Sequence, residues 1–563
     1  MAGRQALVKR LRDFMLTADS YDAEPDASAR GTVLDLRLRA ARDAVDEGLH
    51  QLGSKQWYKE LYGKTAPSRI FWLAACADAG WAAWLLRRLQ AIPALATASP
   101  SSSAQTLLAS CEDLRFAFLK WTLPIKTMVL DGSQDWGRYG GLLAPMLDEA
   151  LLTAVANAAR STAAYARHTG RLAEQAALGG SSADQEEQRA QCAARACEAV
   201  SAIASHCMSV AGQVLPALVI AATKGSGNNA RQLAAPISQL TAALRDSQLP
   251  AAAAAAMLTY PGPNFHPTLG TGWGSGGGPS THTQRPQKPF AVTYDLGEAI
   301  CLLGSKALEG LLAMKHAGSA ASAAGALDAA LSHPDVGTLR LAMLEAVWAH
   351  AGMEPLSEQS DEGSYGGSDS GQGGSGGQDV QEGRWRRRLD WLRHERSTKN
   401  RVCEADGTSA GQLEGHHLTV VVAALGPWRR AKQIGASAPA SLCLPCPSGV
   451  PPEVHMARLT ARTAEALCRM SRGQGLSSYL PRPLWSFSQV NFSTLLMPGE
   501  PGDSADAEAA ALPVGALPPW AEAAAWSLAL HTQALAAEAD GRCGNSVSSA
   551  QFDQRARSYP GCW

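Results

Sequence analysis

The sequence predicts an all-α protein, built from stacked pairs of amphipathic helices. Alanine and leucine dominate the composition, whereas aromatic residues make up only 6%. Both dominant residues favour helices because they lose little side-chain freedom there. In two regions, 208–245 and 300–350, apolar residues also recur at helical spacing. The length of 563 residues exceeds one typical domain, so we expect two or more packed units.

The first helix pair is expected between residues 208 and 245. Apolar residues recur at i, i+3, i+7 and i+10 in its first helix and at i, i+4, i+7 and i+11 in its second. They are Met208, Ala211, Leu215 and Leu218, then Leu233, Ile237, Leu240 and Leu244. Each set forms one apolar stripe. The short KGSGNN turn between them favours an antiparallel pair.

A second pair is expected from Ile300 to Met314 and from Leu327 to Trp348. The apolar positions are Ile300, Leu303, Ala307 and Leu311 on one face, and Leu341, Leu344 and Trp348 on another. The turn at 332–335 contains Pro334 and Asp335. Proline is tolerated at the start of a helix, and a carboxylate is favourable near the positive helix end. We therefore expect a helix to begin there.

One helix pair exposes half of its apolar stripe unless a neighbouring pair covers it. Repeated pairs are therefore expected to stack into an α-solenoid of degenerate HEAT/armadillo-like repeats, interrupted by Gly/Ser/Pro-rich linkers. No strict sequence period is present, so an irregular helical bundle is the alternative. The expected order is a helical block at 1–165, a polar linker at 166–190, a helical-pair block at 191–258, a Pro/Gly-rich linker at 259–290, a HEAT-like pair at 291–354, a Gly/Ser linker at 355–383, a basic Trp-containing helix at 384–402 and a mixed helical and loop region at 403–563.

Charge and cysteine usage restrict the classes of partner and compartment. The formal net charge is −1, so the whole protein creates no field that attracts nucleic acid or acidic membranes. The twelve cysteines are dispersed, and the basic N-terminus lacks the apolar core of a secretory signal. These features favour free thiols and a cytoplasmic location.

Ile70 to Leu86 is barely long enough to cross a membrane and contains Asp78, so we expect a buried core helix there and no membrane partner.

The most distinctive polar feature is the segment RWRRRLDWLRHERSTKNR at 384–401, with eight basic residues against two acidic ones. Arginine binds phosphates in a bidentate manner, and tryptophan stacks on unpaired bases. The segment therefore predicts RNA contact, and the alternative is a solvated basic helix that packs one apolar face on the core. The RNA or phosphate contact candidates are Arg384, Trp385, Arg386, Arg387, Arg388, Trp391, Arg393, Arg396, Lys399 and Arg401.

Catalytic and metal motifs are weak in this sequence. Cys443 and Cys446 have the spacing of a zinc knuckle, which Cys403, His416 and His417 would have to complete. The gaps are irregular and no second CxxC exists, so we expect no metal and no cofactor. The string G-x-S-x-G lies within the Gly/Ser-rich stretch, whereas a serine hydrolase needs it on a strained turn. No catalytic residue is predicted, although an enzyme whose site assembles only in space is one alternative.

The segment GALDAALSHPDVGTLRLAMLEAVWAHAGMEPLS resembles a stretch of the THADA family. An apolar helix ends before a His-Pro-Asp turn, and Leu339–Arg340–Leu341 and Leu344–Glu345 follow. Upstream, GEAICLLGSKALEGLLAMKHAG is similar to a Gly- and Ala-containing helix of the family. The likeness covers residues 30–360, and the Gly/Ser insertion at 361–379 departs from it.

The THADA family consists of large armadillo/HEAT-type regulators of a tRNA 2′-O-methyltransferase. The resemblance implies a non-catalytic scaffold that holds a methyltransferase partner acting on the anticodon loop, with tRNA as a second partner. In that arrangement the methyl donor binds the partner. A generic HEAT-type protein–protein adaptor without RNA is the competing expectation.

Overall fold

The computed structural model describes mainly the first 350 residues and a few positions beyond them. The described residues are 2–23, 34–51, 67–97, 103–126, 140–179, 183–224, 227–259, 296–297, 299–300, 302–314, 318–350, 353, 444, 455, 458–459, 461–463 and 465–466. These residues form helices and no strand, which confirms the all-α prediction for this part of the chain. Two compact units are present: Met1–Arg340 with Arg430–Pro445, and Leu341–Arg429 with Cys446–Trp563.

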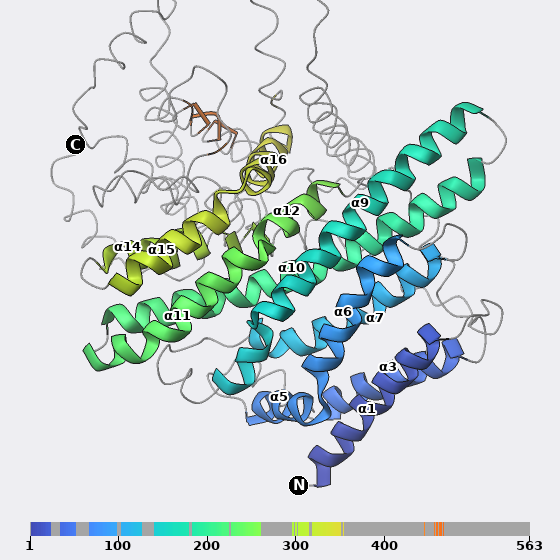
Figure 1. Ribbon diagram of the computed structural model, residues 1–563, viewed down its shortest axis with the longest axis horizontal. Coiled ribbons are helices and arrows are strands. Elements are labelled where there is room, and N and C mark those ends of the chain that lie inside the picture. The colour runs from blue at the N-terminus through green and yellow to red at the C-terminus, as the bar shows by residue number, and fades with distance from the viewer. Residues whose placement is uncertain are drawn as a thin grey trace, which may run out of the picture. The chain divides into compact units, whose positions relative to one another are not determined.

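Five helices form the N-terminal part of the first unit. They are α1 (Ala2–Ala23), α3 (Asp35–Gln51), α5 (Pro67–Ala79), α6 (Trp81–Thr97) and α7 (Ser103–Lys126). Helix α1 packs on α3 and α5, and α6 packs on α7 (Figure 1).

The apolar stretch expected as one core helix over 70–86 is in fact two helices. Gly80 separates α5 from α6 with a φ of 78°, in the left-handed region that favours glycine. Its N–H donates to the carbonyl oxygen of Ala77 at 3.1 Å, as in a glycine-terminated helix end. Both helices contribute to the core, since Trp72 and Trp81 are fully buried.

Two long helices form the centre of the first unit. After the short turn η2 (Ala144–Met146), α9 (Glu149–Gly179) and α10 (Ala183–Lys224) pack against each other along an extended contact. The polar stretch 166–190 is therefore not a linker, because only residues 180–182 lie between the two helices. Its polar residues are mostly Glu, Gln and Arg, which are good helix formers. Asp184 and Glu186 also lie in the first turn of α10, where negative charge is favourable.

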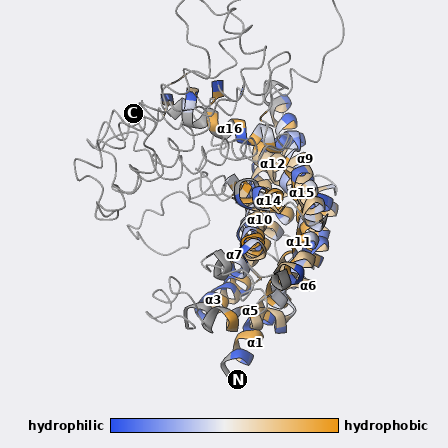
Figure 2. Cartoon of the chain, turned by 90° about the vertical axis from the view of Figure 1, so that its left-hand side faces the viewer, coloured by the Kyte–Doolittle hydropathy of each residue, from blue (hydrophilic) through white to orange (hydrophobic). Residues whose placement is uncertain are grey.

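The helix pair predicted at 208–245 is present in α10 and α11 (Gly227–Ser247), which pack against each other. All eight residues of the two predicted stripes are buried. A further short helix, α12 (Leu249–Thr259), packs on α9 and α10. In Figure 2, hydrophobic and hydrophilic residues alternate along the ribbons of the first unit, as expected for amphipathic helices.

The second predicted pair is more divided than expected. The segment after Ile300 contains a π-helical turn, η5 (Leu303–Leu308), followed by α14 (Glu309–Ala313). Helix α15 (Gly318–Leu331) then precedes α16 (Pro334–His350). The predicted turn before Pro334 is present, and Pro334 is the first residue of α16. The predicted apolar residues of the first helix, and Leu344 and Trp348 of the second, are buried.

Neighbouring helix pairs of the first unit lie side by side. Helix α6 packs on α9, α7 packs on α10, and α11 packs on α15 (Figure 1). Two described helical segments, Gly140–Ala173 and Asp184–Lys224, are long and apolar enough to cross a membrane. Most of each is buried against other helices, as in the core of many water-soluble proteins.

Candidate functional site

The residues predicted to contact RNA, 384–401, lie outside the described part of the chain. The same is true of the weak metal candidates Cys443 and Cys446, and of Cys403, His416 and His417. Among the residues that it describes, no group of three or more His, Cys, Asp or Glu side chains is placed to hold a metal ion.

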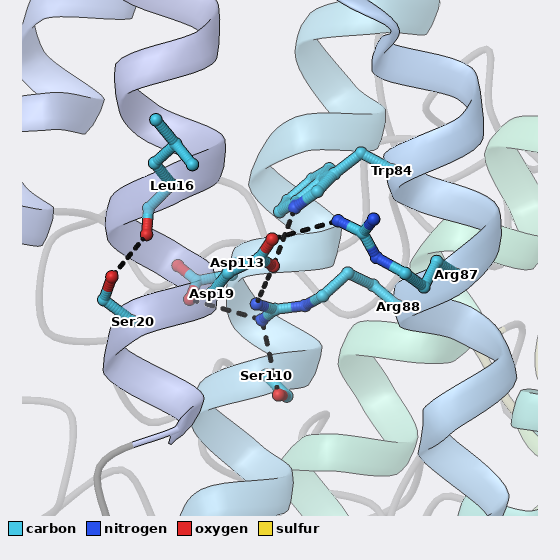
Figure 3. A network of polar contacts seen from close by, with 8 residues as sticks. All are labelled: Leu16, Asp19, Ser20, Trp84, Arg87, Arg88, Ser110 and Asp113. Atoms are coloured by element: carbon cyan, nitrogen blue, oxygen red, sulfur yellow. Dashed lines mark hydrogen bonds and ion pairs between the residues drawn. The ribbon is translucent and has the colours of Figure 1, made fainter.

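The most developed polar arrangement in the described residues is a network that joins four helices of the first unit (Figure 3). It is made by residues of α1, α3, α6 and α7 and is hereafter called the charge network. Its members are Asp19 of α1, Arg42 of α3, Trp84, Arg87 and Arg88 of α6, and Ser110 and Asp113 of α7. The network therefore connects α1 and α3 to α6 and α7.

Asp19 forms one end of the charge network. One of its carboxylate oxygens accepts hydrogen bonds from Trp84 Nε1 at 2.9 Å and from Arg88 Nη1 at 3.3 Å. The other accepts one from Arg87 Nη2 at 3.0 Å. Three donors of α6 thus converge on a single side chain of α1. The neighbouring Ser20 donates to its own helix, at the carbonyl of Leu16, and takes no part.

Asp113 forms the other end and is fully buried. Its Oδ1 accepts hydrogen bonds from Arg42, including one from Nε at 3.2 Å. Its Oδ2 lies 3.9 Å from Arg88 Nη2, which also donates to Ser110 Oγ at 3.4 Å. Arg88 is itself buried and interacts with both carboxylates. Such buried charges are tolerated only where they are paired.

Aromatic rings pack beside the buried part of this network. Phe14 of α1 contacts Trp81, Trp84 and Phe116, with ring centroids 5.5–5.7 Å apart. The Arg88 guanidinium lies 5.3 Å from the Trp84 ring, so it has a cation–π contact in addition to its ion pairs. Low local polarity strengthens the electrostatic interaction of Arg88 with Asp113, because both side chains are buried.

The chemistry of the charge network is structural. The hydrogen bonds described for the two carboxylates come from arginine guanidinium groups and from an indole N–H, and neither kind of donor is a nucleophile. Its effect is to fix α1 and α3 on α6 and α7. The charge network is thus a structural support for these four helices.

Buried thiols are a second chemical feature of the first unit. Burial raises the pKa of Cys197 to about 11 and that of Cys207 to about 12. Burial also raises the pKa of Cys76. These thiols therefore stay protonated at neutral pH, and a protonated thiol is a poor nucleophile and metal ligand. They are core residues and not reactive groups.

Sequence analysis did not identify the charge network. A signal for it was present, because Trp81, Leu85, Arg88 and Ile92 recur at i, i+4, i+7 and i+11. An arginine on an otherwise apolar stripe indicates a buried charge that needs a partner. The partner itself could not be found, since Asp19 and Asp113 are distant in sequence.

No protein-family model, curated protein or solved structure matches this chain.

Proposed function

We propose that this chain is a non-catalytic helical-repeat scaffold that assists tRNA modification in the cytoplasm. It would hold a tRNA 2′-O-ribose methyltransferase and present the anticodon loop of the tRNA to it. The main observation behind this proposal is that the pair α6 and α7 packs on the pair α9 and α10. Helix α6 contacts α9, and α7 contacts α10.

The packing of the helices supports the scaffold part of the proposal. In a HEAT- or armadillo-like array, each pair contacts mainly its neighbours, and the array offers an extended surface to partners. The contacts of α6 and α7 with α9 and α10 follow this pattern, and α11 continues it by packing on α10 and α15. The charge network would hold α1 and α3 in a fixed position against α6 and α7.

The RNA part of the proposal depends on the sequence. The basic segment 384–401 combines eight arginine and lysine residues with two tryptophans, a composition suited to phosphates and unpaired bases. The resemblance of 325–357 to the THADA family supplies the methyltransferase partner. Because the partner would bind the methyl donor, this chain needs no cofactor of its own.

A generic protein–protein adaptor is the second candidate. The net charge of −1 favours it, because most of the chain has no electrostatic attraction to nucleic acid. Under this function the basic segment is a solvated helix, and the helical surface binds proteins only. An enzyme with a site assembled in space is a third candidate.

Affinity purification of the full chain, followed by proteomics and RNA sequencing, distinguishes these functions. The scaffold function predicts recovery of a tRNA methyltransferase together with tRNA. Recovery of other proteins without tRNA would overturn it in favour of the adaptor. A matched chain with Arg386→Glu, Arg387→Glu and Arg388→Glu serves as the control: tRNA recovery should fall, and methyltransferase recovery should persist if that contact is made by the helices.

A further inference from the structure

The second unit contains a helical contact between residues that are far apart in the sequence. Trp348, near the end of α16, is fully buried. Its indole Nε1 donates a hydrogen bond to Thr463 Oγ1 at 3.1 Å, across 115 residues of chain. The guanidinium of Arg462 lies 5.3 Å from the centre of the same ring. A large side chain of α16 is thus enclosed by a segment from the C-terminal region.

The described residues between 455 and 466 are mostly buried, including Ala461, which lies on a different side of the helix from the other buried residues. They are all helical, and His455, Leu459, Thr463 and Ala466 recur at i, i+4, i+8 and i+11. Each of these four is buried, whereas Arg458 is exposed. In Figure 1 this segment is the short orange piece near α16. Such burial is expected of a helix that packs against other parts of the protein.

We propose that α16 and the segment 455–466 are the two helices of one interrupted pair, which the long insertion between them divides in sequence but not in space. The segment is then an internal docking partner of α16, and Trp348 is the centre of its interface. A buried indole that fills a pocket and satisfies its N–H is typical of the residues that dominate helix docking.

The Thr463 hydroxyl explains why this docking is specific. It donates to the carbonyl oxygen of Leu459 in its own helix at 2.7 Å and accepts from the Trp348 indole. Both polar groups of the interface are therefore satisfied, which a purely apolar residue at 463 would not achieve. An unpaired buried indole N–H would weaken the interface.

Consequently, the chain between the two helices is not needed to hold them together. The Gly/Ser-rich stretch at 361–379 cannot contribute a packed core, by its composition. A chain cut in this stretch and again between 446 and 454 should keep its C-terminal piece bound through the contact with α16.

The test uses the full chain with one protease recognition sequence in place of residues 365–371 and a second inserted after Ser448. After purification and cleavage at both sites, the C-terminal piece should co-elute with the N-terminal piece in size-exclusion chromatography at micromolar concentration. Separation of the two pieces would overturn the proposal.

Two variants of the doubly cut chain make the test specific. Thr463→Val removes the acceptor of the indole hydrogen bond and should raise the dissociation constant about tenfold, whereas Thr463→Ser keeps the acceptor and should stay within about threefold of the parent. Trp348→Ala should release the piece entirely. If Thr463→Val and Thr463→Ser bind equally, or if Trp348→Ala folds and retains the piece, the Trp348 interface does not hold the segment.

Discussion

Asp19 of α1 and Arg88 of α6 form an ion pair of 3.3 Å between carboxylate oxygen and guanidinium nitrogen, although 69 residues separate them in the sequence. Arg88 also lies 3.9 Å from Asp113 of α7. One buried guanidinium therefore lies within ion-pair distance of two carboxylates from different helices. The position of α1 against α6 and α7 therefore depends on the charges of Asp19, Arg88 and Asp113.

Replacement of Asp113 by alanine should strongly destabilise the first unit. Asp113 is fully buried and pairs with Arg42 and Arg88, so its loss removes the carboxylate that lies on the buried side of both arginines. Breaking a buried pair in this way costs about 3–5 kcal/mol. Urea denaturation followed by circular dichroism should show this loss in the free energy of unfolding.

Arg87→Ala is the matched control for this prediction. Arg87 pairs with Asp19 in the same network, but its side chain is 68% exposed, whereas that of Asp113 is 0% exposed. Solvent screens such a pair, so its removal should cost about 0–1 kcal/mol. Equal losses in Asp113→Ala and Arg87→Ala would show that burial does not determine the strength of the network.

The helical stripes were predictable because they depend only on local spacing. Residues such as Leu215 and Leu240 fall on faces that periodicity alone identifies, and both are buried. The charge network was not predictable in the same way. Arg88 stands out on an apolar stripe, yet its partners belong to other helices and only tertiary packing brings them together.

The polar stretch 166–190 shows a different limit of sequence reasoning. Its charged and amide side chains suggested a linker, but they are also good helix formers, and α9 and α10 run through most of it. Polarity here indicates the exposed ends of two long helices. Hydrophobicity alone does not distinguish an exposed helix end from a loop, because an exposed helix end and a loop both lack a large apolar face.

Glycines that allow close helix packing are expected to resist substitution. A Cβ on Gly310 would lie 2.5 Å from Val219 Cγ1, and one on Gly212 would lie 2.9 Å from the Cα of Ala299. Both distances are too short, so the helices must shift. Gly310→Ala and Gly212→Ala should each lower the free energy of unfolding by about 1–3 kcal/mol.

Gly170→Ala and Gly325→Ala provide the controls, because a Cβ there meets nothing within 4 Å. Both residues lie inside helices, where alanine is favoured over glycine, so these variants should be more stable by about 0.5–1 kcal/mol. In addition, Val219→Ala should relieve part of the cost of Gly310→Ala in the double variant. If all four glycine-to-alanine variants changed the free energy of unfolding equally, the close packing at Gly310 and Gly212 would be contradicted.

If the basic segment contacts RNA, reversing three of its charges should weaken binding and reduce its dependence on salt. Arg386→Glu, Arg387→Glu and Arg388→Glu remove up to three phosphate contacts. Each contact contributes about 0.7 to the logarithmic salt slope for a single-stranded region. The slope should therefore fall by about 2, measured by fluorescence anisotropy with an anticodon stem-loop at several salt concentrations.

The matched control for this experiment changes the same net charge elsewhere. Lys9 of α1 and Arg37 and Arg39 of α3 are exposed and can be reversed to Glu together. RNA affinity and salt slope should then stay close to those of the parent. If both triple variants lose affinity equally, the effect is one of total charge, and the segment 384–401 is not a specific contact.

The buried thiols predict a loss of stability at alkaline pH. Burial raises the pKa of Cys207 from its usual value of 9.0 to about 12. Above pH 9 the thiol ionises in the unfolded chain but stays protonated in the folded one, so the unfolded state binds fewer protons. The contribution of Cys207 to stability is therefore constant below pH 9 and falls as the pH rises from 9 towards 12.

Comparison with Cys207→Ala isolates this contribution from other groups that titrate at alkaline pH. The free energy of unfolding, measured with urea and a reducing agent at pH 8 and pH 10, should fall in the parent by about 1.4 kcal/mol more than in the variant, because one thiol contributes that much per pH unit in this range. Cys197→Ala should behave similarly, since burial raises the pKa of Cys197 to about 11. The cavity left by either substitution lowers stability at both pH values equally, so it cancels in the comparison. An identical pH dependence in the parent and in Cys207→Ala would mean that this thiol ionises as readily in the folded protein as in the unfolded chain, which is incompatible with its burial in α10.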